Sequence, residues 1–310
     1  MLPSAFKDRF QSLPDNTRGA AILMLAAFFF AVMTLIVKIL GERLHVTQIL
    51  FVRQIVMTAI VMPMIVKGFP GVLKTGRAGL QLARIGFALC AMLFGFTAVI
   101  HLPLADATAI GFAKSFFVPI FATLILAETV GPRRWAAVVM GFAGVMIMLK
   151  PGTDGFSHYG LMALAGAAAA GIVMVIIRLM SRTESNTTIL TWQAVGIGIC
   201  MAMPGIWYWQ WPTPHEWLLL IAMGGISYVA QMFNIMAYRH GEASVMASLD
   251  YVRLVYATFF GWLVFDNLPD RFTFIGAAVI VAASIYTIHR ETRVRKDLTS
   301  NPQSRSHVPH

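Results

Sequence analysis

The second half of this chain repeats the order of hydrophobic spans found in the first half. The span ending in Val37-Lys38-Ile39-Leu40 matches the span ending in Ile177-Arg178-Leu179-Met180, 140 residues later. Two further matches pair Met62-Pro63 with Met203-Pro204 and Phe96-Thr97 with Phe233-Asn234. Because each copy holds an odd number of spans, five, the second copy must enter a membrane in the opposite direction to the first. Inverted repeats of this kind are the architecture of alternating-access carriers.

Composition places the chain in a lipid bilayer. Of its 310 residues, 58% are hydrophobic and only 12% are charged, whereas a soluble domain carries about 25% charged residues. Stretches without Asp, Glu, Lys or Arg cover residues 19–37, 85–104, 155–177, 185–214 and 217–238, and about 20 apolar residues cross the hydrocarbon layer as a helix. We therefore predict an all-α integral membrane protein with ten transmembrane helices, arranged as two inverted five-helix repeats. The predicted helices lie near 17–40, 46–66, 79–100, 105–126, 132–149, 157–180, 186–206, 215–236, 242–264 and 270–288.

The distribution of Lys and Arg predicts the orientation. With the N-terminus in the cytoplasm, 17 of the 24 Lys and Arg residues fall on the cytoplasmic side, 4 on the far side and 3 inside spans, as the positive-inside rule requires. We expect a multi-pass protein of a bacterial inner membrane with both termini in the cytoplasm. Its predicted parts are an N-terminal segment (1–16), a first repeat (17–150), a second repeat (151–289) and a disordered cytoplasmic tail (290–310).

The net charge of +10 is explained by cytoplasmic loops that face anionic lipid headgroups. The expected partners are therefore a small-molecule substrate and the lipid bilayer, with no nucleic acid, and assembly as a homodimer stays open. Cys90 and Cys200 lie in apolar spans without metal-ligand spacing and are expected to be small buried hydrophobic residues. No cofactor and no metal are expected.

Four charged residues lie inside predicted spans, where each charge costs about 2.5–3.5 kcal/mol. They are Arg53, Lys114, Asp250 and Arg253. Three cations and one anion leave a surplus of positive charge, which suits a cavity for a carboxylate, a phosphate or an electron-rich ring. Two structural alternatives are open: Arg53 can extend to the headgroups, and Asp250 and Arg253, three residues apart, can form a neutral pair on one helix face. The functional alternative makes Asp250 the coupling residue, as a proton carrier or as an anchor for a cationic group of the substrate.

Uncharged polar and aromatic residues near these charges complete the predicted substrate site. Gln231 and Asn234 lie on one face of a predicted helix. When the two repeats are aligned, Arg53 falls next to Gln193. Tyr251 is a candidate for stacking on an aromatic ligand. The alternative for the amides is hydrogen bonding between helices, and the alternative for Tyr251 is packing.

Four motifs carry a resemblance to a known family. They are LADATAI at 104–110, ATLILAE at 122–128, GFAGV at 141–145 and GWLVFDNLP at 261–269. With them, residues 17–288 resemble the drug/metabolite transporter superfamily, specifically its EamA-like ten-helix members. The resemblance implies a secondary transporter for a small polar metabolite, such as riboflavin, adenosylmethionine or an amino acid. Within the superfamily, the chain looks most like the branch of adenosylmethionine carriers at His45, Phe51, Arg53 and Lys150-Pro151. It departs from many members at Lys114, where they have an uncharged residue.

We therefore expect a carrier that works by alternating access and is not an enzyme. The main alternative is an integral-membrane enzyme acting on a lipid-linked substrate, which would need paired His or acidic residues near one interface; the histidines here are scattered singly. A channel would need a repeated polar filter loop, and ATP-driven transport would need a phosphate-binding loop; the sequence contains neither. Import or export, and proton coupling, exchange or facilitated diffusion, stay open.

Overall fold

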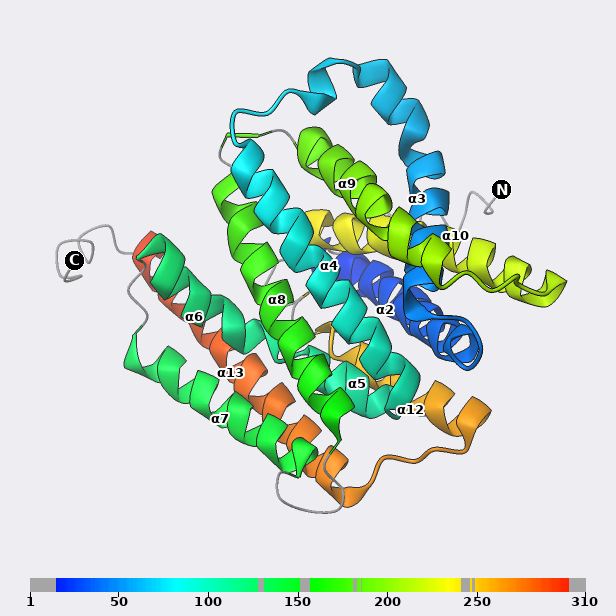
Figure 1. The fold of residues 1–310 in the computed structure, drawn as a ribbon. Helices are drawn as coiled ribbons and strands as arrows, with labels where there is room; N and C mark the ends of the chain where they lie inside the picture. Colours follow the sequence, from blue (N-terminus) through cyan, green and yellow to red (C-terminus); the bar gives the residue numbers. More distant parts are fainter. Residues whose placement is uncertain are drawn as a thin grey trace, which may run out of the picture.

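The computed structural model describes residues 15–127, 131–150, 157–180, 183–184, 186–240, 246 and 249–300. These residues form helices joined by short loops, with no β-strand among them (Figure 1). In chain order the helices are α2 (Asp15–Gly41), α3 (Val46–Gly68), the 3₁₀ turn η1 (Gly71–Leu73), α4 (Ala78–His101), α5 (Leu104–Gly111), α6 (Lys114–Leu126), α7 (Pro132–Leu149), α8 (His158–Met180), α9 (Asn186–Trp207), α10 (Pro214–His240), α12 (Val252–Phe265) and α13 (Arg271–Ser300).

Ten segments account for the predicted transmembrane helices. Six of the described segments are long and apolar enough to cross a membrane: α2, α3, α4, the α5–α6 pair, α8 and α10. Shorter apolar helices lie within α7, α12 and α13, and α9 is 22 residues long. The prediction of a ten-helix, all-α membrane protein is therefore confirmed.

The structure differs from the prediction in three places. The ninth predicted helix, 242–264, has a turn at Asp250 and Tyr251 before α12, and part of its range lies outside the described residues. The fourth predicted helix is two helices, α5 and α6, separated by a turn at Phe112 and Ala113. The predicted tail is helical in part, because α13 continues to Ser300; residues 290–300 were expected to be disordered. Polar composition alone suggested disorder there, but a helix that has already formed extends at little cost per residue.

Most of the extensive helix contacts occur twice, once between given helices and once between the equivalent helices of the other repeat. Helices α2, α3, α4, α6 and α7 correspond to α8, α9, α10, α12 and α13. The closest pairs are α2 with α10 and α4 with α8, which correspond to each other. The pair α6–α8 likewise has its counterpart in α12–α2, and α10–α3 in α4–α9. Two further pairs, α3–α9 and α7–α13, are their own counterparts, as expected of an inverted repeat with a two-fold relation.

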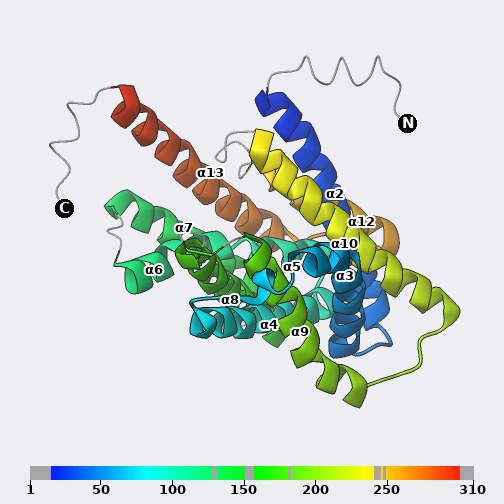
Figure 2. The same ribbon diagram turned by 90° about the horizontal axis from the view of Figure 1, so that it is seen from above.

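Each bundle of the molecule combines helices of both repeats. Figure 1 shows α4 and α8 side by side in the centre, with α9 beside them, and Figure 2 shows α2 alongside α10. We name α2, α3, α10 and α12 the first bundle and α4, α6, α8 and α9 the second bundle. Helices α7 and α13 pack against each other beside the second bundle (Figure 1).

Close contact between α7 and α13 depends on two glycines. A Cβ atom added to Gly276 would lie 2.6 Å from the carbonyl oxygen of Gly144, and one added to Gly144 would lie 2.8 Å from the carbonyl oxygen of Gly276. Small residues allow membrane helices to associate at this distance. Neither helix can relieve such an overlap by a side-chain rotation, because backbone atoms are involved.

We expect Gly276→Ala to lower the free energy of unfolding by about 1–3 kcal/mol relative to a control, because overpacking forces backbone shifts of this cost. Gly79→Ala is the matched control, since no atom lies within 4 Å of a Cβ added there. Denaturant unfolding of the purified protein in detergent measures both. Equal stability of the two variants would contradict the close α7–α13 contact.

Candidate functional site

The two repeats each contain a helix break at equivalent positions. In the first repeat the amides of Ser115 and Phe116 donate to the carbonyls three residues before them, those of Phe112 and Ala113. In the second repeat the amides of Arg253 and Leu254 donate in the same way, 138 residues later. Both helices that follow, α6 and α12, end at a left-handed residue with φ of 52°, Ala127 and Asp266. The breaks are thus a repeated feature of the fold.

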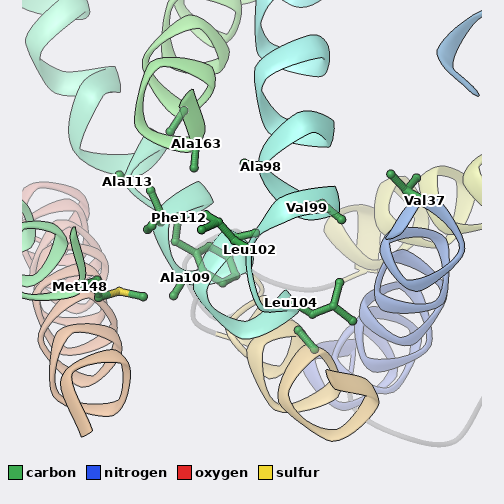
Figure 3. Close-up of a cluster of buried hydrophobic side chains, with 14 of the residues drawn as sticks. Val37, Ala98, Val99, Leu102, Leu104, Ala109, Phe112, Ala113, Met148 and Ala163 are labelled. Atoms are coloured by element: carbon green, nitrogen blue, oxygen red, sulfur yellow. The ribbon is translucent and has the colours of Figure 1, made fainter. Parts of the chain in front are cut away.

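The two breaks face each other inside the molecule. The rings of Phe112 and Tyr251, one from each break, have centroids 4.6 Å apart, and α5 packs against α12. Figure 3 shows Ala109, Phe112 and Ala113 in the middle of a buried hydrophobic cluster, with Met148 and Val37 on opposite sides. Broken helices in matched positions of inverted repeats are where transporters place their substrate.

Three charged side chains gather at the breaks. Arg253 Nη2 donates to Asp250 Oδ1 at 2.8 Å, which confirms the predicted pair, and its guanidinium lies 4.2 Å from the ring centre of Phe30. Lys114, the first residue of α6, interacts electrostatically with both Asp250 and Arg253. Its ammonium lies 6.0 Å from the ring centre of Phe112.

The cluster has two cations, Lys114 and Arg253, and one carboxylate, Asp250, so its net charge is positive. Asp250 is hydrogen-bonded to Arg253, while the Lys114 ammonium makes no hydrogen bond or ion pair of 4 Å or less to the described residues. The Arg253 Nε is likewise buried without a hydrogen-bond partner in the described part of the chain. A buried donor that stays unpaired costs about 1–3 kcal/mol. An anion placed between Lys114 and Arg253 would satisfy both donors.

Arg53 lies in a separate polar contact between α3 and α10, two helices of the first bundle. Its Nε donates to Ser227 Oγ on α10 at 3.0 Å, and its guanidinium lies 5.8 Å from the ring centre of Phe96. The side chain therefore points into the helix packing, which excludes the alternative that it extends to the headgroups in this structure. No contact between Arg53 and the Lys114 cluster occurs among the described residues.

Gln193 occupies the interface equivalent to that of Arg53. Its Oε1 accepts a hydrogen bond of 2.7 Å from Arg84 Nη1 on α4. Arg84 is fully buried and also donates to the Ile189 carbonyl at 2.5 Å. Arg84 was not predicted as a site residue, because it lies just outside the uncharged stretch 85–104.

The remaining predicted residues lie on α10. Gln231 is exposed and Asn234 is half-buried, and neither side chain makes a hydrogen bond to the described residues. The structure therefore brings Lys114, Asp250, Tyr251 and Arg253 together. It places Arg53, Gln193, Gln231 and Asn234 elsewhere on the helices around them.

A cavity of about 300 Å³ lies at the end of α2 that is predicted to face outward. Its lining includes Gly41, His45, Thr97, Ile100 and His101. Burial lowers the pKa of His45, so the neutral ring accepts the Thr47 amide through Nδ1 at 3.4 Å and caps the start of α3. Among the described residues no group of three or more His, Cys, Asp or Glu could hold a metal ion.

Comparison with known proteins gives consistent matches along most of the chain. Residues 17–150 and 159–288 each match the sequence model of the EamA-like transporter family. A solved crystal structure matches the fold with a TM-score of 0.57 at 19% sequence identity, covering 86% of this chain and 94% of the other. The two family matches correspond to the two repeats found in the sequence.

Several curated relatives are named transporters. The S-adenosylmethionine uptake transporter of Rickettsia prowazekii is 27% identical over 296 residues, which cover 94% of this chain and 99% of that protein. The pseudopaline exporter of Pseudomonas aeruginosa is 29% identical, covering 86% and 94%. The riboflavin transporter of Brucella anthropi is 26% identical, covering 81% and 92%.

Proposed function

Because the chain belongs to the EamA-like transporter family, a family of small-metabolite transporters, we propose that its substrate is a metabolite with an anionic group that Lys114 binds at the paired helix breaks. The observation that carries this proposal is the surplus cation at the breaks. Lys114 and Arg253 supply unpaired donors beside a single carboxylate, Asp250. An ammonium inside a membrane span without its own counter-ion is costly, and a substrate anion supplies that counter-ion.

The aromatic residues beside the cations favour a substrate that also carries a ring. Phe112 and Tyr251 lie between the breaks, and Phe30 lies over Arg253. A carboxylate or phosphate joined to a flat ring would place its charge on Lys114 and its ring on these side chains. Adenosylmethionine, which has a carboxylate and an adenine ring, meets this description. Amino acids, which carry a carboxylate, are further candidates. Riboflavin, which a relative's name and the resemblance suggest, has no anionic group, so transport of riboflavin alone would count against the proposal.

Arg53, Gln193, Gln231 and Asn234 surround this centre in the proposal. They contact the substrate along its route as the two bundles move, since each lies on a helix of the bundle interface or on α10. In this proposal transport proceeds by alternating access, which inverted repeats with helix breaks in matched positions support. No catalytic step is part of this function.

The experiment is uptake into liposomes that contain the purified protein. A labelled panel of adenosylmethionine, riboflavin and amino acids is offered with and without a pH gradient. The proposal expects saturable transport of at least one panel member that carries a carboxylate or phosphate, inhibited by other anions of similar shape. Transport restricted to compounds without a carboxylate or phosphate would contradict the role of Lys114.

Asp250 is the proposed coupling residue. It is the one carboxylate among the charged residues described at the breaks, so protonation there would release Arg253 and alter the local charge. We expect a pH gradient to drive accumulation by the wild type. Asp250→Asn should still exchange substrate across the membrane but lose gradient-driven accumulation. Accumulation by the wild type that ignores the gradient would remove Asp250 from this role.

The proposed location is the inner membrane of a bacterium, with both termini in the cytoplasm. The excess of Lys and Arg in the loops of one side supports this orientation, and the named relatives come from bacteria. Reporter fusions at the two ends test it. Ends that report opposite sides of the membrane would contradict an even number of spans.

A further inference from the structure

The outer ends of the two bundles are joined by Lys38. This residue lies in the last turn of α2, is 9% exposed, and belongs to the first bundle. Its Nζ lies 3.4 Å, 3.2 Å and 2.5 Å from the carbonyl oxygens of Val99, Ile100 and Leu102, at the end of α4 in the second bundle. Figure 3 shows Val99 of α4 pointing toward α2, which carries Val37.

The sequence explains why these carbonyls are available. A helical carbonyl normally accepts from the amide four residues later, and for Val99 that residue is Pro103, which has no N–H. The last carbonyls of a helix lack internal partners and form its negative end. An ammonium has three donors, and Lys38 directs them to three such carbonyls. No carboxylate is needed, so the contact can be exchanged for water without leaving a buried charge unpaired.

Gly41 allows the helix ends to approach this closely. A Cβ atom added to Gly41 would overlap the side chain of Ile100. Gly41, Thr97 and Ile100 also line the 300 Å³ cavity at the outer face. The Lys38 contact therefore closes the helices over a space that extends toward the outer surface.

The equivalent contact on the opposite face differs in the structure. Arg178, on α8, matches Lys38 in the sequence repeat, and its side chain is exposed whereas Lys38 is buried. Helix α2 packs against α4, but the equivalent pair, α8 and α10, has no comparable packing over the described residues. The packing of α3 with α4 and of α6 with α7 likewise has no counterpart of similar extent, so the described residues follow the two-fold relation only in part.

We propose that Lys38 is an outer latch: its ammonium holds the two bundles together at the outer face, and this face opens when Lys38 leaves the end of α4. Arg178 is the matching residue for closing the inner face. The inference rests on the proposed alternating access and adds the residue that controls it. In alternating access the outer and inner faces close one after the other, so each face needs a contact that holds it closed. Lys38 and Arg178 occupy equivalent positions of the two repeats and can provide one such contact each.

The test uses reporter cysteines at equivalent positions of the two repeats, Thr97→Cys for the outer face and Asn234→Cys for the inner face. Cys90 and Cys200 are exposed, and the expectation that they are buried was wrong. Both are first replaced by alanine. Labelling by a membrane-impermeant maleimide is followed in right-side-out and inside-out vesicles. This readout needs no substrate, so it is separate from any transport assay.

Two variants open the latch in different ways. Lys38→Met removes the donors, and Gly41→Ala keeps every charge but wedges the helix ends apart. We expect each to speed labelling at position 97 by about tenfold or more, as loss of hydrogen bonds to a charged group shifts an equilibrium by at least that factor, and to slow labelling at position 234. Lys67→Met and Gly79→Ala are the matched controls, since Lys67 is an exposed lysine in the last turn of α3 and a Cβ at Gly79 meets nothing.

Each other outcome overturns the latch. Unchanged labelling at position 97 in both variants would make Lys38 a static cap of α4. Faster labelling at both reporters would mean general loosening of the fold. If the labelling changes as expected while no panel compound is transported, the latch stands and the proposed substrate fails, so the two proposals are tested separately.

Discussion

Lys114→Met is expected to weaken substrate binding strongly while leaving the protein folded in the membrane. Lys114 gives the break cluster its surplus charge and makes no hydrogen bond to the described residues, so its loss removes no internal bond. A hydrogen bond to a charged group contributes about 1.5–3 kcal/mol, which corresponds to an increase in KM of roughly 10- to 150-fold. Uptake into liposomes measures the effect, and the amount of protein extracted from the membrane measures folding.

A chemical rescue separates charge from shape at this position. Lys114→Cys, in a background without Cys90 and Cys200, should be as inactive as the methionine variant. Reaction with 2-aminoethyl methanethiosulfonate then restores a positive group of nearly lysine length, and transport should return. Reaction with the sulfonate analogue adds a negative group and should not restore it. Full transport by the unmodified cysteine variant would show that the cation is not needed.

Arg253→Met is expected to be the most destabilising single change in the cluster. It leaves Asp250, whose side chain is 16% exposed, without its hydrogen-bonded partner. Removing one member of a buried ion pair costs about 3–5 kcal/mol, because the other charge stays in the interior. Lys114 is close enough to act on Asp250, so we expect the lower end of this range. Unfolding in detergent by denaturant measures the loss.

The double variant Asp250→Asn/Arg253→Met is the control for that loss. It removes both charges, so most of the stability should return, although transport should not. A double variant that is as unstable as Arg253→Met alone would mean that Arg253 acts through its contact with Phe30 and not through Asp250.

The helices could be predicted from the sequence because the bilayer sets both the length of the apolar spans and the side on which Lys and Arg lie. The repeat gave the same division into spans. Lys114 and Val252, which lies beside Arg253, are 138 residues apart, close to the offset of the repeat, and α6 and α12 begin at these two positions. The break at Phe112 and Ala113 was not predicted. No proline or polar run marks it, and its turn is stabilised by contacts such as Phe112 with Tyr251 that only the fold creates.

The burial of Lys38 and Arg84 was also missed. Both lie at the edges of uncharged stretches, where sequence favours a headgroup-facing side chain. Their partners are backbone carbonyls at Val99 to Leu102 and at Ile189. A carbonyl has no sequence signature of its own, so such contacts become visible only when the helix ends are placed in space. Pro103 was the one residue that could have indicated a carbonyl in need of a partner.

Counterflow is the measurement that tests the carrier mechanism most directly. Liposomes containing the protein are loaded with an unlabelled anionic metabolite that the panel has identified, and a trace of the labelled compound is added outside. Alternating access at the paired breaks predicts a transient accumulation of label above its outside concentration in the wild type, and none with Lys114→Met. Label that only equilibrates, at a rate that rises linearly with concentration, would indicate a pore and contradict this account.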